Sequence, residues 1–168
     1  MTAPEYIADV DVLVIGAGPA GLALGHELQR LGMTFVLVER GAAPGESWRR
    51  MPDSLKLVSP WVTNSLPGAP APEIPRFAEV SRSEYARYLV NYARQFEMPL
   101  ISNAGVSSVV RKSDDEFVTH TTRGEILSRL VVNATGYFAK PFVPEIPGAA
   151  TSSIPQIHVA NYRSPQHL

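Results

Sequence analysis

The stretch VLVIGAGPAGLALGHELQRLG, residues 12–32, joins a short apolar run to a glycine-rich turn and then to a helix-like pattern. The apolar run predicts a strand over residues 10–15, and a second β-branched run predicts another over residues 34–38. The segment between them predicts a helix that ends at Gly32 in a left-handed cap, with one face formed at three-residue spacing by Leu22, Gly25, Leu28 and Leu31. Strand, helix and strand together predict a βαβ unit.

The three glycines of this turn have separate roles. Gly16 suits a tight turn, Gly18 lets the backbone approach a pyrophosphate, and Gly21 allows the helix to pack closely on the strand. Pro19 and Ala20 open the helix, where unpaired backbone N–H groups and the helix dipole both favour negative charge. The turn therefore predicts a dinucleotide site, the alternative being a glycine turn that holds no ligand.

An acidic residue closes the second predicted strand. Glu39 lies 18 residues after Gly21, where a carboxylate can accept hydrogen bonds from an adenosine ribose. The same carboxylate repels a 2′-phosphate, so the site suits FAD or NAD better than NADP.

The rest of the chain predicts one further helix and a meander. Residues 83–96 form a helical pattern preceded by Ser81 and Glu84 at capping-box spacing, with an apolar stripe that we assign to the core: Tyr85, Tyr88, Leu89, Tyr92 and Phe96. Alternating patterns predict three antiparallel strands, at residues 106–111, 116–122 and 125–133, with a solvated charged turn at residues 112–116. The proline-rich segment 41–80 is too long for an idle connection, and we expect it to pack over a site. The predicted fold class is α/β, a Rossmann-like FAD/NAD(P)-binding domain with a parallel sheet and a small antiparallel β-meander.

Composition excludes several function classes. A formal net charge of -1 gives no basic surface for nucleic acid. The longest apolar stretch is broken by Asp11 and glycines, and no secretory signal pattern flanks it, so we expect a cytoplasmic protein without a membrane partner. There is no cysteine, the four histidines lack metal-ligand spacing, and no GxSxG motif occurs. We therefore expect no metal site and no cysteine or serine nucleophile.

Four stretches resemble the flavin-containing monooxygenase family, including its YUCCA-type and Baeyer–Villiger members. They are GAGPAG with Glu39, GESWRR at residues 45–50, LKLVSPWVTNSLPG at residues 55–68, and NATGYFAKPFVPEIPG at residues 133–148. The following IHVANYRSP, residues 157–165, is similar to the family's HSxxY stretch, but Val159 replaces its usual small polar residue.

The resemblance implies the site residues as well. The implied FAD-binding set is Gly16, Gly18, Pro19, Ala20, Gly21, Glu39, Arg40, Ser47, Trp48, Arg49, Val106, Ala134, Thr135 and Gly136. In this set Trp48 walls the flavin ring and Arg49 pairs with phosphate or ribityl oxygens, the alternatives being an aromatic that packs a loop and a solvated charge. Ser59 and Asn64, in the stretch that faces flavin or substrate in relatives, are the candidate active-site residues.

The resemblance further implies an NADPH-reduced FAD that oxygenates a small organic substrate through a C4a-hydroperoxide, with the flavin carrying the chemistry. We expect residues 1–150 to be an incomplete FAD-binding domain and residues 151–168 to lead to an NADPH-binding domain that this sequence lacks. Three hypotheses stay open: part of a monooxygenase, a non-catalytic nucleotide-binding module, or another Rossmann-type oxidoreductase. The first would be completed by missing sequence or by a partner chain, and the second would be stabilised by a second copy of the chain that covers the bare interdomain face.

Overall fold

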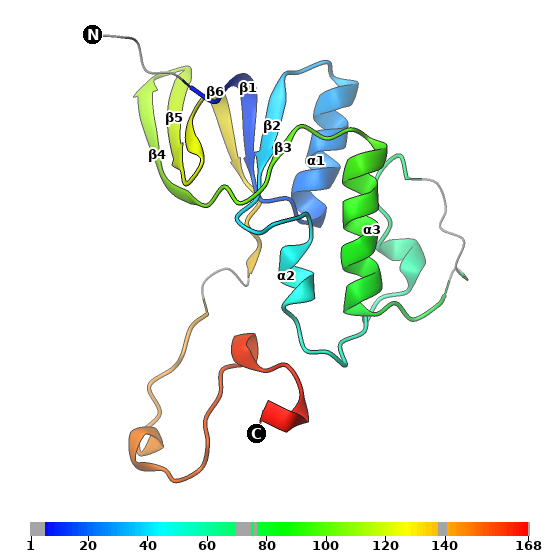
Figure 1. Ribbon diagram of the computed structural model, residues 1–168, viewed down its shortest axis with the longest axis vertical. Coiled ribbons are helices and arrows are strands. Elements are labelled where there is room, and N and C mark those ends of the chain that lie inside the picture. The colour runs from blue at the N-terminus through cyan, green and yellow to red at the C-terminus, as the bar shows by residue number, and fades with distance from the viewer. Residues whose placement is uncertain (1–5, 70–74, 76, 138–140, 168) are drawn as a thin grey trace.

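The computed structural model describes residues 6–69, 75, 77–137 and 141–167. One six-stranded sheet with the order β3-β2-β1-β6-β5-β4 forms the body, with helices packed beside it (Figure 1). The strands are β1 Ala8–Ile15, β2 Phe35–Val38, β3 Leu100–Ile101, β4 Val106–Ser113, β5 Glu116–Thr121 and β6 Gly124–Asn133. The α-helices are α1 Pro19–Arg30, α2 Glu46–Arg49 and α3 Arg82–Gln95, and short 3-10 turns occur at Trp61–Thr63, Ala149–Thr151, Val159–Asn161 and Pro165–His167.

The sheet has a parallel half and an antiparallel half. Strand β1 pairs in parallel with both β2 and β6, and β2 pairs in parallel with β3. Strands β4, β5 and β6 form the predicted antiparallel meander, and β6 joins it to the parallel strands. The βαβ unit and the Rossmann-like fold class predicted from the sequence are therefore confirmed.

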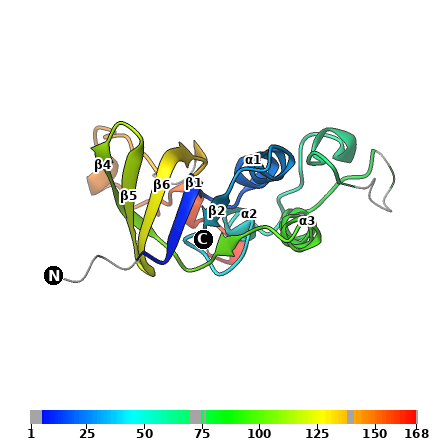
Figure 2. The same ribbon diagram turned by 90° about the horizontal axis from the view of Figure 1, so that it is seen from above.

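The central strands are buried on both faces, as strands of parallel sheets usually are. All four residues of β2 are buried. On one face, Val12, Val14 and Leu37 join residues of α1 and α3 in a single core cluster. On the other face, Leu13, Val36 and Ile126 form a second cluster. Figure 2 shows α1 and α3 beside the β1–β3 end of the sheet, away from β4 and β5.

Helix α1 begins and ends nearly where the sequence predicts. Gly18 is its N-cap, Pro19 occupies the first turn, and Gly32 follows with a φ of +67°. The expectation that Leu31 shares one face with Leu22, Gly25 and Leu28 was wrong, since these three are buried and Leu31 is 72% exposed. A three-residue step turns the helix by about 300°, so three steps carry Leu31 about half a turn from Leu22. The buried face is Gly21, Leu22, Gly25 and Leu28.

Helix α3 confirms its predicted capping box. The Ser81 side chain accepts a hydrogen bond from the Glu84 N–H, and the Glu84 carboxylate accepts one from the Ser81 N–H. The predicted stripe lies in the core: Tyr85, Leu89 and Tyr92 are buried, and Tyr88 and Phe96 pack against them half-buried.

Two segments lie outside the regular layers. Residues 41–69 pack on the helix side of the sheet through α2, the buried Trp61 and neighbouring apolar side chains. Residues 141–167, which we call the C-terminal arm, run away from the sheet and return near α2 (Figure 1), where the Asp53 N–H donates to the Arg163 carbonyl at 2.8 Å. The predicted charged turn at residues 112–116 is exposed, as expected. Within the described ranges no helix is long and apolar enough to cross a bilayer.

Candidate dinucleotide site

Three strands deliver the predicted site residues to one edge of the sheet. Ile15 is in register with Val38 and with Asn133. The residues that follow these positions therefore leave the sheet at the same edge. They are Gly16 after β1, Glu39 after β2 and Ala134 after β6, and we call this group, with residues 17–21, 135 and 136, the glycine edge.

The three glycines occupy three different environments. Gly16 has a φ of +108°, and a Cβ on it would lie 2.5 Å from the Ala134 carbonyl oxygen. A Cβ on Gly21 would lie 2.0 Å from the Gly16 carbonyl oxygen, so α1 packs directly on the turn. A Cβ on Gly18 would have no neighbour within 4 Å. The turn is therefore tight at Gly16 and Gly21 and open at Gly18, where the backbone faces free space.

The N-terminus of α1 adds donors at this open point. No side chain caps it, its first turn carries no acidic residue, and Pro19 has no N–H to give. The first N–H groups of a helix have no partner within the helix, and the helix dipole favours an anion beside them. Free space at Gly18 together with an uncapped helix start fits a pyrophosphate group.

Glu39 joins two parts of the glycine edge by hydrogen bonds. Its Oε2 accepts a hydrogen bond from the Ala17 N–H at 3.0 Å, and its Oε1 accepts one from the Gly41 N–H at 2.7 Å. The half-buried carboxylate thus holds the glycine turn and the loop after β2 at once. Each carboxylate oxygen keeps acceptor capacity that a ribose hydroxyl can use.

The exit from β6 is held by a residue that the sequence analysis missed. The Asn133 Oδ1 accepts hydrogen bonds from the Thr135 hydroxyl at 2.7 Å and from the Thr135 N–H at 3.2 Å. Ala134 is half-buried, and Thr135 and Gly136 are exposed, the latter with a φ of +76°. An asparagine two residues before a threonine at a strand end is the signal that could have identified this turn.

The predicted residues of α2 divide between packing and surface. Trp48 is half-buried, and its ring meets the Tyr85 ring edge to face at 4.7 Å between centroids. Arg49 is exposed and lies 3.6 Å from the Glu46 carboxylate in an ion pair, and Ser47 is exposed. The helix is joined to the glycine turn because the Gly45 N–H donates to the Ala17 carbonyl at 3.1 Å.

The two candidate active-site residues lie together in the loop around Trp61. The Asn64 Nδ2 donates to the carbonyls of Ser59 and Pro60, both at 2.9 Å. Ser59 is exposed and Asn64 is half-buried. The Asn64 carbonyl accepts a hydrogen bond from the Tyr85 hydroxyl at 3.4 Å, so this loop and Trp48 meet on the same tyrosine.

Arg40 and the segment that leads to Val106 lie next to Glu39. Arg40 is exposed, and its Cγ would lie 3.7 Å from a Cβ on Gly105. The Ala104 N–H donates to the Glu39 carbonyl at 2.8 Å, which brings the start of β4 at Val106 beside the loop after β2. Hydrogen bonds thus connect the loop after β2 both to the glycine turn and to the segment that leads into β4.

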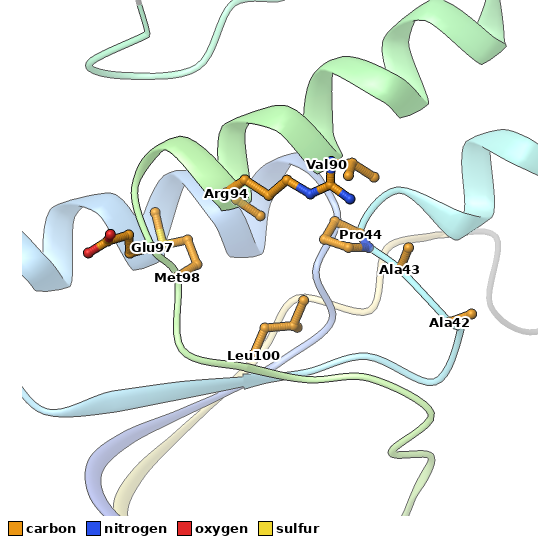
Figure 3. A pocket seen from close by; sticks show the side chains of 9 residues that line it. Ala42, Ala43, Pro44, Val90, Arg94, Glu97, Met98 and Leu100 are labelled. Carbon is orange, nitrogen blue, oxygen red and sulfur yellow. The ribbon is translucent and has the colours of Figure 1, made fainter.

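One hollow lies away from the predicted site. It measures about 350 Å³ and lies between α3, β3 and the loop after β2, with the Arg94 side chain extended beside Pro44 and the Glu97 carboxylate directed away (Figure 3). Apolar side chains dominate its wall, and no residue of the predicted site lines it. The described part of the chain gathers no group of three potential metal ligands.

A parallel βαβ unit with an open glycine turn, an uncapped helix start and a carboxylate at the end of the second strand defines a Rossmann-type nucleotide-binding protein. Comparison with known proteins gives the family. The chain belongs to the pyridine nucleotide-disulphide oxidoreductase family, whose model matches residues 13–168. None of the 168 residues is a cysteine, so no sulfur of this sequence can take part in disulphide exchange.

The relatives include flavin monooxygenases. An uncharacterised CzcO-like oxidoreductase of Geobacillus kaustophilus is 38% identical over 159 residues, which cover 95% of this chain and 45% of the relative. A probable indole-3-pyruvate monooxygenase of Arabidopsis thaliana, YUCCA1, is 34% identical over 90% of this chain and 37% of its own length. The structure of a flavin-containing monooxygenase from Stenotrophomonas maltophilia matches with a TM-score of 0.85 and 32% identity, over 95% of this chain and 48% of that protein.

These similarities confirm the resemblance to flavin monooxygenases noted in the sequence. The chain spans less than half the length of each of these relatives.

Proposed function

We propose that this chain is the FAD-binding part of a flavin-dependent monooxygenase. The observation that carries the proposal is the open glycine turn: Gly18 faces free space at the uncapped start of α1, while Gly16 and Gly21 are closed by backbone contacts. The similarity to flavin monooxygenases supports a flavin as the nucleotide. Its pyrophosphate would meet the first turn of α1, and its adenosine ribose would meet Glu39.

FAD is favoured over NADP at this edge by Glu39. A 2′-phosphate beside its carboxylate would add like charges at close range, whereas a free ribose hydroxyl can donate to it. NADPH would then bind outside these residues, at a second nucleotide site. That site, the division of the chain near residue 150 and a cytoplasmic location all stay predictions from the sequence.

The chain's own residues would bind and orient the cofactor. Backbone N–H groups at the start of α1 would hold the pyrophosphate, and the carboxylate of Glu39 would fix the adenosine end. Trp48 and Asn64, which meet on Tyr85, would line the flavin end. A bound flavin reduced by NADPH supplies oxygen activation for a small organic substrate, and the protein supplies position and exclusion of water.

A partner surface is the second part of the proposal. The C-terminal arm exposes a run of large apolar side chains, with exposed fractions of 43–80%: Phe142, Val143, Ile146, Ile154, Ile157 and Val159. Exposed apolar surfaces of this kind mark sites of interaction with another protein or domain. We propose that a folded domain packs against the arm. That domain belongs either to further polypeptide or to a second copy of the chain.

The experiment is an absorption spectrum of the purified chain with and without added FAD, followed by denaturation to release and identify the nucleotide. Flavin bands that stay with the protein through gel filtration, and release FAD on denaturation, support the proposal. A chain that stays colourless and gains no thermal stability with FAD contradicts it. Release of NAD instead would favour another Rossmann-type oxidoreductase.

A further inference from the structure

Three tyrosine hydroxyls of α3 meet the backbone of one loop. The Tyr85 hydroxyl donates to the Asn64 carbonyl at 3.4 Å, and the Tyr92 hydroxyl donates to the Pro67 carbonyl at 2.6 Å. Between them, the Tyr88 hydroxyl accepts a hydrogen bond from the Leu66 N–H at 2.6 Å. Spacings of three and four residues place these side chains on one face of the helix, so their order along α3 follows the order of the loop.

The rings behind these hydroxyls contact one another in a row, which we call the tyrosine ladder (Tyr85, Tyr88 and Tyr92). The rings of Tyr85 and Tyr88 are stacked at 5.8 Å between centroids, and those of Tyr88 and Tyr92 are tilted at 6.1 Å. Trp61, from the same loop, packs edge to face on Tyr88 at 4.7 Å. A core position needs only an apolar ring, so hydroxyls at all three positions call for a further reason.

The hydroxyls stay protonated. Burial raises the pKa of Tyr85 and of Tyr92 to about 12, with a smaller contribution from the neighbouring Tyr88. Burial also raises the pKa of Tyr88, although its bond with the Leu66 amide acts in the opposite direction. Tyr85 and Tyr92 are therefore neutral donors to loop carbonyls throughout the physiological pH range.

The ladder holds the loop that carries Asn64. With its Nδ2 bonded to two carbonyls, the Asn64 amide has one orientation, and its Oδ1 remains an acceptor. The Tyr85 ring also contacts the Trp48 ring of α2. Helix α2 is in turn joined to the glycine turn, because the Gly45 N–H donates to the Ala17 carbonyl. Tyr85 thus connects the loop of Asn64, through Trp48 and α2, to the glycine edge.

We propose that Tyr85, Tyr88 and Tyr92 are positioning residues that fix the backbone of residues 64–67 and thereby set Asn64 and Trp61 relative to the flavin end of the site. The proposal rests on the proposed function for its ligand. The ladder sets the flavin end, whereas the glycine edge binds the ADP half of FAD. Ladder variants therefore change the surroundings of the flavin ring while FAD affinity is retained.

The test compares Tyr88→Phe, Tyr92→Phe and their double variant with Tyr6→Phe, a half-buried tyrosine before β1 at the opposite end of that strand from the glycine turn. Phenylalanine keeps the ring and removes only the hydroxyl. Without FAD, amide hydrogen exchange is followed at Leu66 and across α3. Loss of the acceptor for the Leu66 N–H is expected to speed its exchange by about tenfold, with exchange in α3 unchanged.

With FAD, the visible absorption spectrum and the affinity are measured for the same four variants. The expected result is a shifted flavin spectrum in the ladder variants, an unshifted one in Tyr6→Phe, and similar FAD affinity in all.

Unchanged exchange at Leu66 in the double variant would overturn the positioning role, whether or not FAD binds. Faster exchange with an unshifted flavin spectrum would also overturn it, because the ladder would then hold the loop without affecting the site. If the wild-type chain binds no FAD, the proposed function fails, and with it the link to the flavin end, while the exchange result still decides whether the ladder fixes the loop.

Discussion

The glycine edge and the tyrosine ladder fix the backbone in opposite ways. At the glycine edge, residues approach because side chains are missing: Gly21 lies so close to the Gly16 carbonyl that a Cβ would stand 2.0 Å from it. At the ladder, long side chains reach across from α3 and bond the backbone of a loop that has little regular structure of its own. The first region tolerates no added atom at Gly16 or Gly21, and the second depends on single hydroxyl groups. Substitutions at the two regions should therefore fail in different ways.

The largest effect is expected from Gly21→Ala. Its methyl group would meet a backbone carbonyl that cannot move without opening the turn, so we expect a loss of about 3 kcal/mol in the free energy of unfolding. Urea titration measures it, with Gly18→Ala as the matched control. Gly18 has a φ of −82° and open space around its Cα, so its variant should unfold within about 0.5 kcal/mol of the wild type. Equal unfolding midpoints for the two variants would remove the distinction between the closed and open glycines.

A smaller loss of stability is expected from Glu39→Gln. Glutamine offers one acceptor oxygen where the carboxylate offers two, so either Ala17 or Gly41 loses the acceptor for its N–H. A hydrogen bond to a charged group contributes about 2 kcal/mol, which should appear in urea unfolding. The control is Glu46→Gln, whose carboxylate only pairs with surface arginines at 3.6 and 3.5 Å and should matter by about 0.5 kcal/mol or less. A loss no larger than that of the control would show that Glu39 does not hold the turn.

The third prediction concerns a variant that should lose FAD affinity while its free energy of unfolding stays nearly unchanged. In Gly18→Ala, the added methyl group occupies the space in which the backbone approaches the pyrophosphate, so FAD affinity should fall by about tenfold or more. Titration followed by flavin fluorescence measures this, on a variant whose fold is intact by the unfolding control above. Unchanged affinity would mean that the nucleotide does not approach Gly18.

The smallest effect is expected at the start of α3. Hydrogen bonds from the Ser81 hydroxyl and N–H lower the pKa of Glu84 from its usual 4.5. Since a lowered folded-state pKa favours the charged form, the stabilisation is fully present above about pH 4.5 and is lost as the pH falls through the lowered value. Thermal unfolding measured against pH should show this loss in the wild type and not in Glu84→Gln. Parallel pH profiles for the two proteins would contradict the assignment.

The same contrast explains what could be predicted from the sequence. Local patterns specify the glycine turn and the capping box, because each depends on residues within a few positions of one another. The two-residue strand β3 and the four-residue helix α2 are too short for a periodic pattern, so they were not predicted. The stripe on α3 was correctly assigned to the core, but its hydroxyl bonds join residues 21–25 positions apart, which no local pattern reports. Leu31 was wrongly placed because a strict three-residue spacing drifts around a helix of 3.6 residues per turn.

Competition between nucleotides decides whether the glycine edge holds the ADP half of FAD. The chain is loaded with FAD, and ADP and FMN are titrated separately against it while the flavin bound to protein is followed after rapid filtration. We expect ADP to displace FAD, because ADP carries the pyrophosphate and ribose that the glycine edge would bind. FMN, which lacks the adenosine half, should not displace it. Displacement by FMN with no effect of ADP would place the affinity at the flavin end and show that the glycine edge does not hold the ADP half.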